Sequence, residues 1–479
     1  MDCILKEGPV DRNLAVRSFK AIDRTDTGRN ASTSSTHIQA YAEATLVEAR
    51  KRYFENNNKS HAVHQQALAC LPGGNTRTAL YSSPFPLSMV SGTCFTVTDE
   101  DGHKYTDLVG EFSAGLYGHS EPTIRDALGS ALNHIGLNLG AHTKYEVEYA
   151  SLICSRFGFD RVRFCNSGTE ANINAIMAAR YFTRKRKVVA FTGGYHGGVL
   201  SFRDKPAANT INDTDFVVVE YNNPEAATAA IEGDPHVGAV LVEAMQGASG
   251  CILGRDEFLH AVQASTRKVG AVLILDEVLT SRLAPGGLQS ILGLQPDITT
   301  LGKYLGGGLA FGAFGGRKEI MDVFDPRASR SLPHSGTFNN NTLTMRAGYI
   351  GLSSVYTPDK AVTFNCSGEI LLTRLQELCK GTQCCWTGRG SLLASHFTQT
   401  GSEDIVSISD LRENECLKEL FWLEMMEDGF WTTRRGSVAI ILGTPQAELD
   451  RFLSCVEQFL LRHRDIVALP RGHDPIMRA

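Results

Sequence analysis

A lysine and an aspartate in two separate motifs are the residues of this sequence that best fit covalent chemistry. Lys303 lies in TTLGKYLGGG, after a β-branched run and before several glycines, and Asp276 lies at the end of the apolar run LILDEV. Taken alone, a lysine is most often a solvated surface residue. A buried carboxylate, however, needs a cationic or hydrogen-bonding partner, because an isolated charge is costly to bury. The two motifs are therefore candidates for parts of one site.

Two motifs rich in small residues could supply the other parts of such a site. In FCNSGTEAN, Ser167, Gly168 and Thr169 precede a helical pattern, where backbone N–H groups and two hydroxyls could bind an anion. In FTGGYHGG, Tyr195 and His196 follow the run KVVAF, and the aromatic ring could stack on a flat ligand. Taken alone, the first motif is more often only a helix cap, and a packed loop aromatic explains the second equally well. Together, an anion cradle, an aromatic plate, a buried carboxylate and a lysine are the groups that pyridoxal phosphate requires.

The elements that must position these motifs predict an α/β fold. Short apolar runs alternate with longer segments of helical periodicity; the runs are KVVAF, FVVVEY, AVLVEA, AVLILDEV and ITTLGK. Strands that are apolar on both faces and alternate with helices form a mostly parallel sheet covered by helices. Ligands bind beyond the carboxyl ends of the strands in such sheets, and the four motifs fall there. After about residue 355, helical patterns and the runs SLLASHF and VAIILG predict a smaller α+β domain.

The order of the motifs NSGTEA, GGYHG, LDEV, LGK and SGTF resembles the class III aminotransferases of fold type I. More narrowly, the chain is similar to their glutamate-1-semialdehyde aminomutase-like branch, and within it to the β-amino-acid aminotransferases. The resemblance covers residues 67–443. It implies a fold type I enzyme with a mostly parallel, seven-stranded-type sheet and a smaller α+β domain. Pyridoxal phosphate is the implied cofactor, and no metal is expected.

The same resemblance implies roles for individual residues. Lys303 would form the Schiff base with the cofactor, and Asp276 would face the pyridine nitrogen. The resemblance also implies a homodimer with shared active sites, because Thr337 in HSGTFNNN would reach the phosphate of the second subunit. The remaining cofactor contacts would come from Ser167, Gly168, Thr169, Tyr195, His196 and Val278, with Val278 on the ring face opposite Tyr195.

Arginines in two segments are the candidate substrate-binding residues. Arg77 lies in LPGGNTR, and Arg434 and Arg435 lie in GFWTTRRGSVAI. An isolated arginine is most often a surface charge, although a guanidinium suits a carboxylate better than other side chains do. Both segments resemble those of β-amino-acid aminotransferases, in which arginines bind the carboxylates of donor and acceptor. This implies that Arg77 and one of Arg434 or Arg435, with Arg435 favoured, bind substrate.

The predicted reaction is the transfer of an amino group from an amino acid, expected to be a β-amino acid, to a 2-oxo acid. An intramolecular aminomutase is the alternative, because it would use the same groups while retaining its own diamine intermediate. A non-catalytic protein that keeps the fold is a third reading. The presence of both Lys303 and Asp276 argues against it.

Composition and charge restrict the partners of the chain. It has 479 residues, of which 47 are basic and 52 are acidic, so no net positive field is available to hold nucleic acid. Its apolar runs are far shorter than the roughly 20 residues of a membrane span. The 12 cysteines are scattered, and the N-terminus lacks the pattern of a secretory signal, so reduced thiols and a cytoplasmic location are expected.

The sequence predicts four regions along the chain. Residues 1–40 form a flexible N-terminal extension, and residues 41–110 form the N-terminal segment of the small domain. Residues 111–350 form the large cofactor-binding domain, and residues 351–479 complete the small domain. Within the second region, a helical pattern from Ile38 to Leu71 precedes a hairpin that turns at Asp101-Gly102.

Overall fold

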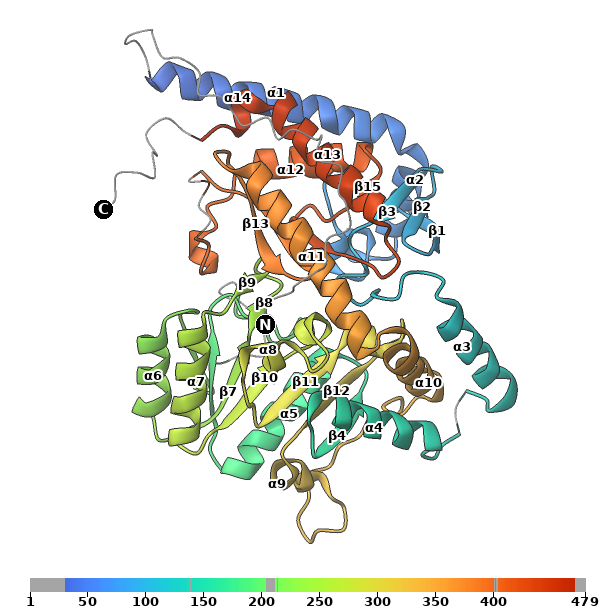
Figure 1. Cartoon of the computed structure of the whole chain (residues 1–479), viewed down its shortest axis with the longest axis vertical. Helices are drawn as coiled ribbons and strands as arrows, with labels where there is room; N and C mark the ends of the chain where they lie inside the picture. Colours follow the sequence, from blue (N-terminus) through green and yellow to red (C-terminus); the bar gives the residue numbers. More distant parts are fainter. Residues whose placement is uncertain are drawn as a thin grey trace, which may run out of the picture.

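The computed structural model describes residues 31–137, 139–203, 212, 214–399, 401 and 404–469 (Figure 1). Most of the predicted N-terminal extension, residues 1–30, lies outside the described residues. The helix α1 spans Ala31–Asn56 and α2 spans Asn58–Leu68, so the boundary predicted at residue 40 falls inside α1. The single helical pattern predicted from Ile38 is thus two helices with a break at Asn57, whose backbone is not helical.

A seven-stranded sheet forms the centre of the large part of the molecule, in the order β4-β12-β11-β10-β7-β5-β6 (Figure 1). Strands β11, β10, β7, β5 and β6 pair in parallel, whereas β12 is antiparallel to both of its neighbours. The predicted mostly parallel sheet is therefore confirmed. The strands are β4 (Arg161–Cys165), β5 (Lys187–Phe191), β6 (Phe216–Val219), β7 (Val237–Glu243), β10 (Val272–Asp276), β11 (Ile298–Gly302) and β12 (Gly312–Gly316).

Helices cover both faces of this sheet, which explains why its central strands are apolar throughout. In β7, Val240 and Val242 belong to the hydrophobic cluster that includes α6 (Pro224–Gly233) and α7 (Asp256–Lys268). The alternate residues Ala239 and Leu241 belong to the cluster built on α5 (Gly168–Thr183). Successive side chains of a strand point to opposite faces, so both sets must be apolar. Further helices beside the sheet are α3 (Pro122–His134), α4 (Lys144–Phe157), α8 (Leu288–Leu292), α9 (Lys318–Met321) and α10 (Thr342–Ile350).

The smaller part combines segments from both ends of the chain (Figure 1). Helix α1 packs on α12, and strand β3 pairs in parallel with β15. Its helices are α1, α11 (Pro358–Cys379), α12 (Glu415–Glu427), α13 (Gln446–Arg462) and α14 (Arg464–Val467). One sheet contains β1 (Met89–Thr93), β2 (Thr96–Asp99), β3 (Lys104–Asp107) and β15 (Phe430–Trp431), and the other contains β13 (Cys384–Arg389), β14 (Leu392–Phe397) and β16 (Ser437–Ala439).

One buried arginine connects the two parts. Arg282 follows β10, and its guanidinium donates hydrogen bonds to Ser391 Oγ at 3.2 Å and to the carbonyl oxygens of Ile440 and Ser113 at 2.5 and 3.4 Å. Burial lowers the pKa of Arg282 to about 10. These bonds fix the edge of the small part against the end of the large sheet.

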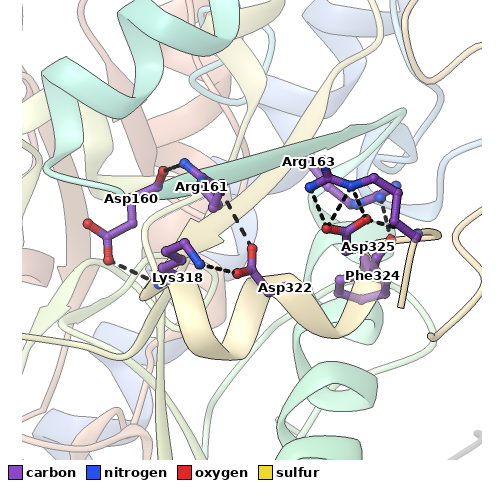
Figure 2. A network of polar contacts seen from close by, with 8 residues as sticks. Asp160, Arg161, Arg163, Lys318, Asp322, Phe324 and Asp325 are labelled. Carbon is purple, nitrogen blue, oxygen red and sulfur yellow. Dashed lines mark hydrogen bonds and ion pairs between the residues drawn. The ribbon is translucent and has the colours of Figure 1, made fainter. Parts of the chain in front are cut away.

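A network of charged side chains lies at the other end of the large sheet, beside the first residue of β4 (Figure 2). Lys318 Nζ lies 2.6 Å from Asp322 Oδ2, and its backbone N–H donates to Asp160 Oδ2 at 3.0 Å. Arg161 Nε lies 3.7 Å from Asp322 Oδ1, and Arg163 donates to the carbonyl oxygen of Phe324 at 2.7 Å.

Among the described residues, no helix has the length and apolar character that a membrane crossing needs.

Candidate active site

The sequence motifs meet in one cavity at the carboxyl ends of the parallel strands. The cavity has a volume of about 1620 Å³ and lies between the large sheet and the small part. Its wall includes most of the predicted site residues: Arg77, Gly168, Thr169, Tyr195, His196, Asp276, Val278, Lys303, Arg434 and Arg435. Ser167 and Thr337 are not part of this wall.

Asp276, the last residue of β10, is buried and takes part in three hydrogen bonds, which leaves Oδ1 with room for a further donor. Its Oδ2 accepts from Asn172 Nδ2 and lies 2.7 Å from His196 Nδ1, and its Oδ1 accepts from the backbone N–H of Val278. Burial disfavours the charged imidazole, but the hydrogen bond and charge of Asp276 outweigh it and raise the pKa of His196. The site therefore holds a fixed anion, which can keep a proton on a ring nitrogen placed against it.

Asn172 on α5 was not identified from the sequence, although it orients this carboxylate. Its Nδ2 donates to Asp276 at 2.7 Å, and its Oδ1 accepts from Thr300 Oγ1 at 2.7 Å. The spacing in the sequence could have identified Asn172, because it lies four residues after Gly168 and therefore on the same face of α5. The motif FCNSGTEAN thus supplies a positioning residue in addition to the loop.

Lys303 follows β11 at the point where the chain turns back into β12. Its Nζ donates to the carbonyl oxygen of Phe112 at 2.7 Å, and its φ of 57° is in the left-handed region. Burial, followed by repulsion from Arg435, lowers the pKa of Lys303 to about 8, although Asp276 opposes the change. An amine with this pKa is partly neutral near pH 8 and can act as a nucleophile or base.

The loop before α5 has the close packing that an anion cradle needs. Ser167 is the N-cap of the helix, and its Oγ accepts from the backbone N–H of Glu170 at 3.2 Å. A Cβ at Gly168 would lie 2.7 Å from both methyl groups of Val278, so only glycine allows this approach. The cap explains Ser167 without a ligand, and its predicted phosphate contact stays a prediction.

Tyr195 extends from the loop after β5 and is 43% exposed. Its backbone N–H donates to Glu243 Oε2 at 2.9 Å, and Gly247 donates to the other oxygen. Burial raises the pKa of Glu243 to about 7, with His196 opposing the change and Asp276 adding to it. Tyr195 and Val278 both reach the cavity, but the predicted ring sandwich between them stays a prediction.

The two adjacent arginines near the C-terminus have different surroundings. Arg434 pairs with the buried carboxylate of Glu419 at 2.7 Å, which also pairs with Arg50. The guanidinium of Arg435 instead lies 4.9 Å from the centre of the Phe112 ring. The Nε atoms of both adjacent arginines are buried and have no hydrogen-bond partner among the described residues. Burial and the charge of Arg203 lower the pKa of Arg435. Arg435 is thus the one of this pair that is available to an anion in the cavity.

Two further arginines surround the same space. The guanidinium of Arg77 lies 5.1 Å from the Phe112 ring centre and pairs with Glu111. Arg203 lines the cavity, and its buried Nε has no hydrogen-bond partner. Neither Arg203 nor Phe112 was assigned a role from the sequence, although Phe112 lies in the segment EFSAGLYGHSEP, which follows LPGGNTR along the chain.

Thr337 lies in an exposed segment outside this cavity. The segment is held near the loop before α5, because Asn166 Nδ2 donates to Asn339 Oδ1 at 2.9 Å. The predicted contact of Thr337 with a second subunit stays a prediction.

Residues 79–446 match the family model of the class-III aminotransferases. The chain belongs to this family. An uncharacterized aminotransferase of Schizosaccharomyces pombe is 45% identical over 88% of the chain and 96% of its own length. A β-phenylalanine transaminase of Variovorax paradoxus is 44% identical over 89% of the chain and 98% of its own length. A glutamate-1-semialdehyde 2,1-aminomutase of Chloroherpeton thalassium is 31% identical over 82% of the chain and 95% of its own length.

Solved structures of aminotransferases share the fold. The β-phenylalanine aminotransferase of Variovorax paradoxus superimposes with a TM-score of 0.87 at 43% identity, covering 89% of this chain and 99% of that one. A transaminase solved with pyridoxal phosphate bound has a TM-score of 0.77 at 30% identity, covering 85% and 99%. The chain is thus a fold type I pyridoxal-phosphate enzyme of the aminotransferase class, as predicted from its motifs.

Proposed function

We propose that this class-III aminotransferase uses pyridoxal phosphate to move an amino group from a β-amino acid to a 2-oxo acid. The observation that carries the proposal is the group of cations around the Phe112 ring. Arg77 and Arg435 both lie over this ring, and the carbonyl oxygen of the same residue accepts from Lys303 Nζ. Two carboxylate-binding groups therefore surround the reactive amine. The 44% identity to a β-phenylalanine transaminase supports the same substrate class.

The residues of the cavity fit the cofactor. Asp276 would hold the proton on the pyridine nitrogen, and His196 and Asn172 keep its carboxylate in place. The N-terminus of α5, with Gly168 and Thr169, would hold the phosphate. When bound, the cofactor supplies an electron sink for the negative charge that develops on the amino-bearing carbon.

Lys303 moves the proton in this proposal. Its Nζ takes a proton from the amino-bearing carbon of the donor and returns one to the acceptor carbon. Burial and the nearby charge of Arg435, which lower its pKa to about 8, favour the neutral amine that this transfer needs.

The arginines select the substrate. In the proposal, Arg435 binds the carboxylate of the donor or acceptor by a charge-assisted hydrogen bond, and Arg77 provides a second cation for the same purpose. Arg434, although one residue away, is assigned to the stability of the small part, because it pairs with the buried Glu419. The distance between carboxylate and amine is one carbon longer in a β-amino acid than in an α-amino acid.

We also propose a homodimer in which Thr337 approaches the phosphate of the second subunit. The exposed position of Thr337 beside the loop before α5 supports this arrangement. A cytoplasmic location is proposed as well. Its support is that the described cysteines are free thiols, a state that a reducing compartment maintains.

An aminomutase is the second candidate, because relatives of that activity are 30–34% identical to the chain. It would use the same lysine and aspartate. The two candidates differ in their need for an acceptor: an aminotransferase stops after one half-reaction when no 2-oxo acid is present, whereas an aminomutase turns over without one.

A half-reaction experiment tests the proposal. Purified enzyme with its cofactor is mixed with 3-amino-3-phenylpropanoate, with its isomer phenylalanine, or with 1-phenylethylamine, and the change in the visible absorbance of the cofactor is followed. The β-amino acid should react fastest, and added 2-oxoglutarate or pyruvate should restore the starting spectrum. Equal rates for all three amines would reject the β-amino-acid proposal, and failure of borohydride to attach the cofactor to Lys303 would reject the assignment of the lysine.

A further inference from the structure

Four successive residues at the rim of the cavity have a left-handed backbone. The φ values of Gly110, Glu111, Phe112 and Ser113 are 50°, 49°, 52° and 74°. Only the first is glycine, although the other residue types rarely adopt this conformation. A run of this kind persists only where its surroundings enforce it, and such runs are found at ligand sites.

Buried polar groups enforce the conformation of this turn, residues 110–113. Asp107 Oδ1 accepts from the backbone N–H groups of Val109 and Gly110 at 2.7 and 2.9 Å. Arg282 donates to the carbonyl oxygen of Ser113, and the N–H of Gly115 closes the turn on the carbonyl oxygen of Gly110. The backbone of the turn is therefore held, whereas the exposed side chain of Glu111 can move when a ligand binds.

The turn contacts three cations of the cavity. The carbonyl oxygen of Phe112 accepts from Lys303 Nζ, and the ring of the same residue lies under Arg77 and Arg435. The carboxylate of Glu111 pairs with Arg77. Glu111 thus provides Arg77 with a carboxylate partner, which is the same kind of partner that a substrate carboxylate would be.

We propose that Glu111 is a specificity-determining residue, whose carboxylate occupies Arg77 in the absence of substrate and is displaced by the substrate carboxylate. The inference rests on the proposed function, because it needs a substrate that carries a carboxylate. The exchange leaves the number of charges at Arg77 unchanged, since one carboxylate replaces another. A neutral amine cannot make this exchange, so Glu111 stays on Arg77 when such an amine enters.

The displacement is energetically accessible. The side chains of Arg77 and Glu111 are 45% and 59% exposed, and ion pairs with this exposure contribute little to stability. The released Glu111 carboxylate can turn into water, where its charge is solvated. Glu111 therefore orients Arg77 before binding but weakens the affinity for carboxylates by the free energy of the pair.

Binding of an unreactive carboxylate tests this exchange. 3-Phenylpropanoate has no amino group, so its dissociation constant can be measured by calorimetry on the enzyme with its cofactor, with neutral 3-phenylpropanamide as the matched ligand. The variants are Glu111→Gln, Arg77→Met and the double variant. Glu319→Gln serves as the control variant, because Glu319 forms an ion pair of similar exposure with Arg317 (52% and 49%) away from the cavity.

Glu111→Gln should bind 3-phenylpropanoate about three- to fivefold more tightly than the unmodified enzyme, the range expected for loss of an exposed competing pair. Its affinity for the amide should not change, and Glu319→Gln should behave like the unmodified enzyme. In the Arg77→Met background the gain from Glu111→Gln should disappear, because the two residues act as one pair.

Three results would overturn the inference. Unchanged or weaker binding by Glu111→Gln would mean that the pair only orients Arg77. An equal gain with and without Arg77 would mean that Glu111 acts through its charge at a distance. Binding unaffected by Arg77→Met would mean that Arg77 does not receive the carboxylate. Because the ligand cannot react, each result is separate from the half-reaction that tests the proposed function.

Discussion

The charged side chains at the two ends of the large sheet differ in whether they are paired. At the amino end of β4, the network of Figure 2 pairs Arg161 and Lys318 with Asp322, in positions where both partners reach water. At the carboxyl ends of the strands, Arg435 and Arg203 each keep a buried Nε without a hydrogen-bond partner. The ion pairs of the first arrangement lie within the chain, whereas we propose that the donors of the second bind an anionic substrate.

This difference separates charges that are paired within the chain from charges that we propose bind a ligand. An exposed ion pair contributes little, because water and salt compete with it. A buried unpaired donor is costly, so the chain gains from it only when a ligand satisfies it. The position of a charge in this molecule therefore predicts which measurement its removal will change.

The largest effect is expected from matched lysine substitutions at the two ends. Lys303→Ala should lower kcat about 10²–10⁴-fold, because it removes the group that we propose moves the proton. Lys318→Ala removes a lysine of the Figure 2 network and should leave kcat unchanged. Steady-state rates with a β-amino acid and a 2-oxo acid provide the measurement. Comparable losses in the two variants would break the comparison.

A smaller effect is expected from the adjacent arginines. Arg435→Met should cost about 1.5–3 kcal/mol in transition-state binding, seen as a lower kcat/KM for carboxylate substrates. Arg434→Met should instead lower the thermal midpoint, because Glu419 loses a partner while it remains buried. If Arg434→Met lost kcat/KM and Arg435→Met did not, the assignment of the two residues would be reversed.

The pH dependence sharpens the comparison within the cavity. The pKa of about 8 belongs to Lys303 as a free amine, the form in which the proposal has it act after the substrate displaces it, so single-turnover rates should increase between pH 7 and 9. Arg435 repels the protonated amine and thereby lowers this pKa. Arg435→Met should therefore shift the rise to higher pH. A shift to lower pH, or a rate that falls from pH 7 to 9, would contradict this account.

The smallest effect is expected in the network itself. Arg161→Met removes an ion pair whose atoms are 3.7 Å apart, and it should change the free energy of unfolding by less than about 1 kcal/mol. Urea denaturation measures this change, and added salt should reduce it further. A loss of several kcal/mol would show that exposed pairs do carry the stability of this end of the sheet.

The parallel core of the fold could be predicted because its strands are continuous apolar runs. Strands β7 and β10 are buried on both faces, and their sequences contain hardly any polar residue before Glu243 and Asp276. Strand β12, GAFGG, could not be predicted from apolar character. A Cβ at Gly312 would collide with the carbonyl of Ser167. The glycines of β12 are therefore determined by the close approach of two backbone segments and not by apolar burial.

The candidate site also contains residues that could be predicted from the sequence and residues that could not. Residues that follow strands could be predicted, because the carboxyl ends of parallel strands meet at one edge, and Asp276, Tyr195 and Lys303 lie there. Phe112 and Arg203 could not, because their positions depend on the path of loops. For Phe112 that path includes a left-handed turn, which cannot be predicted from residues other than glycine.

The backbone of Lys303 suggests that this enzyme gives up stability for activity. A φ of 57° disfavours any residue with a Cβ, and burial of its amine adds a further cost. Glycine or asparagine at this position would relieve the backbone and remove the buried amine together. Variants selected only for thermal resistance should therefore tend to lose a side chain that we propose is catalytic.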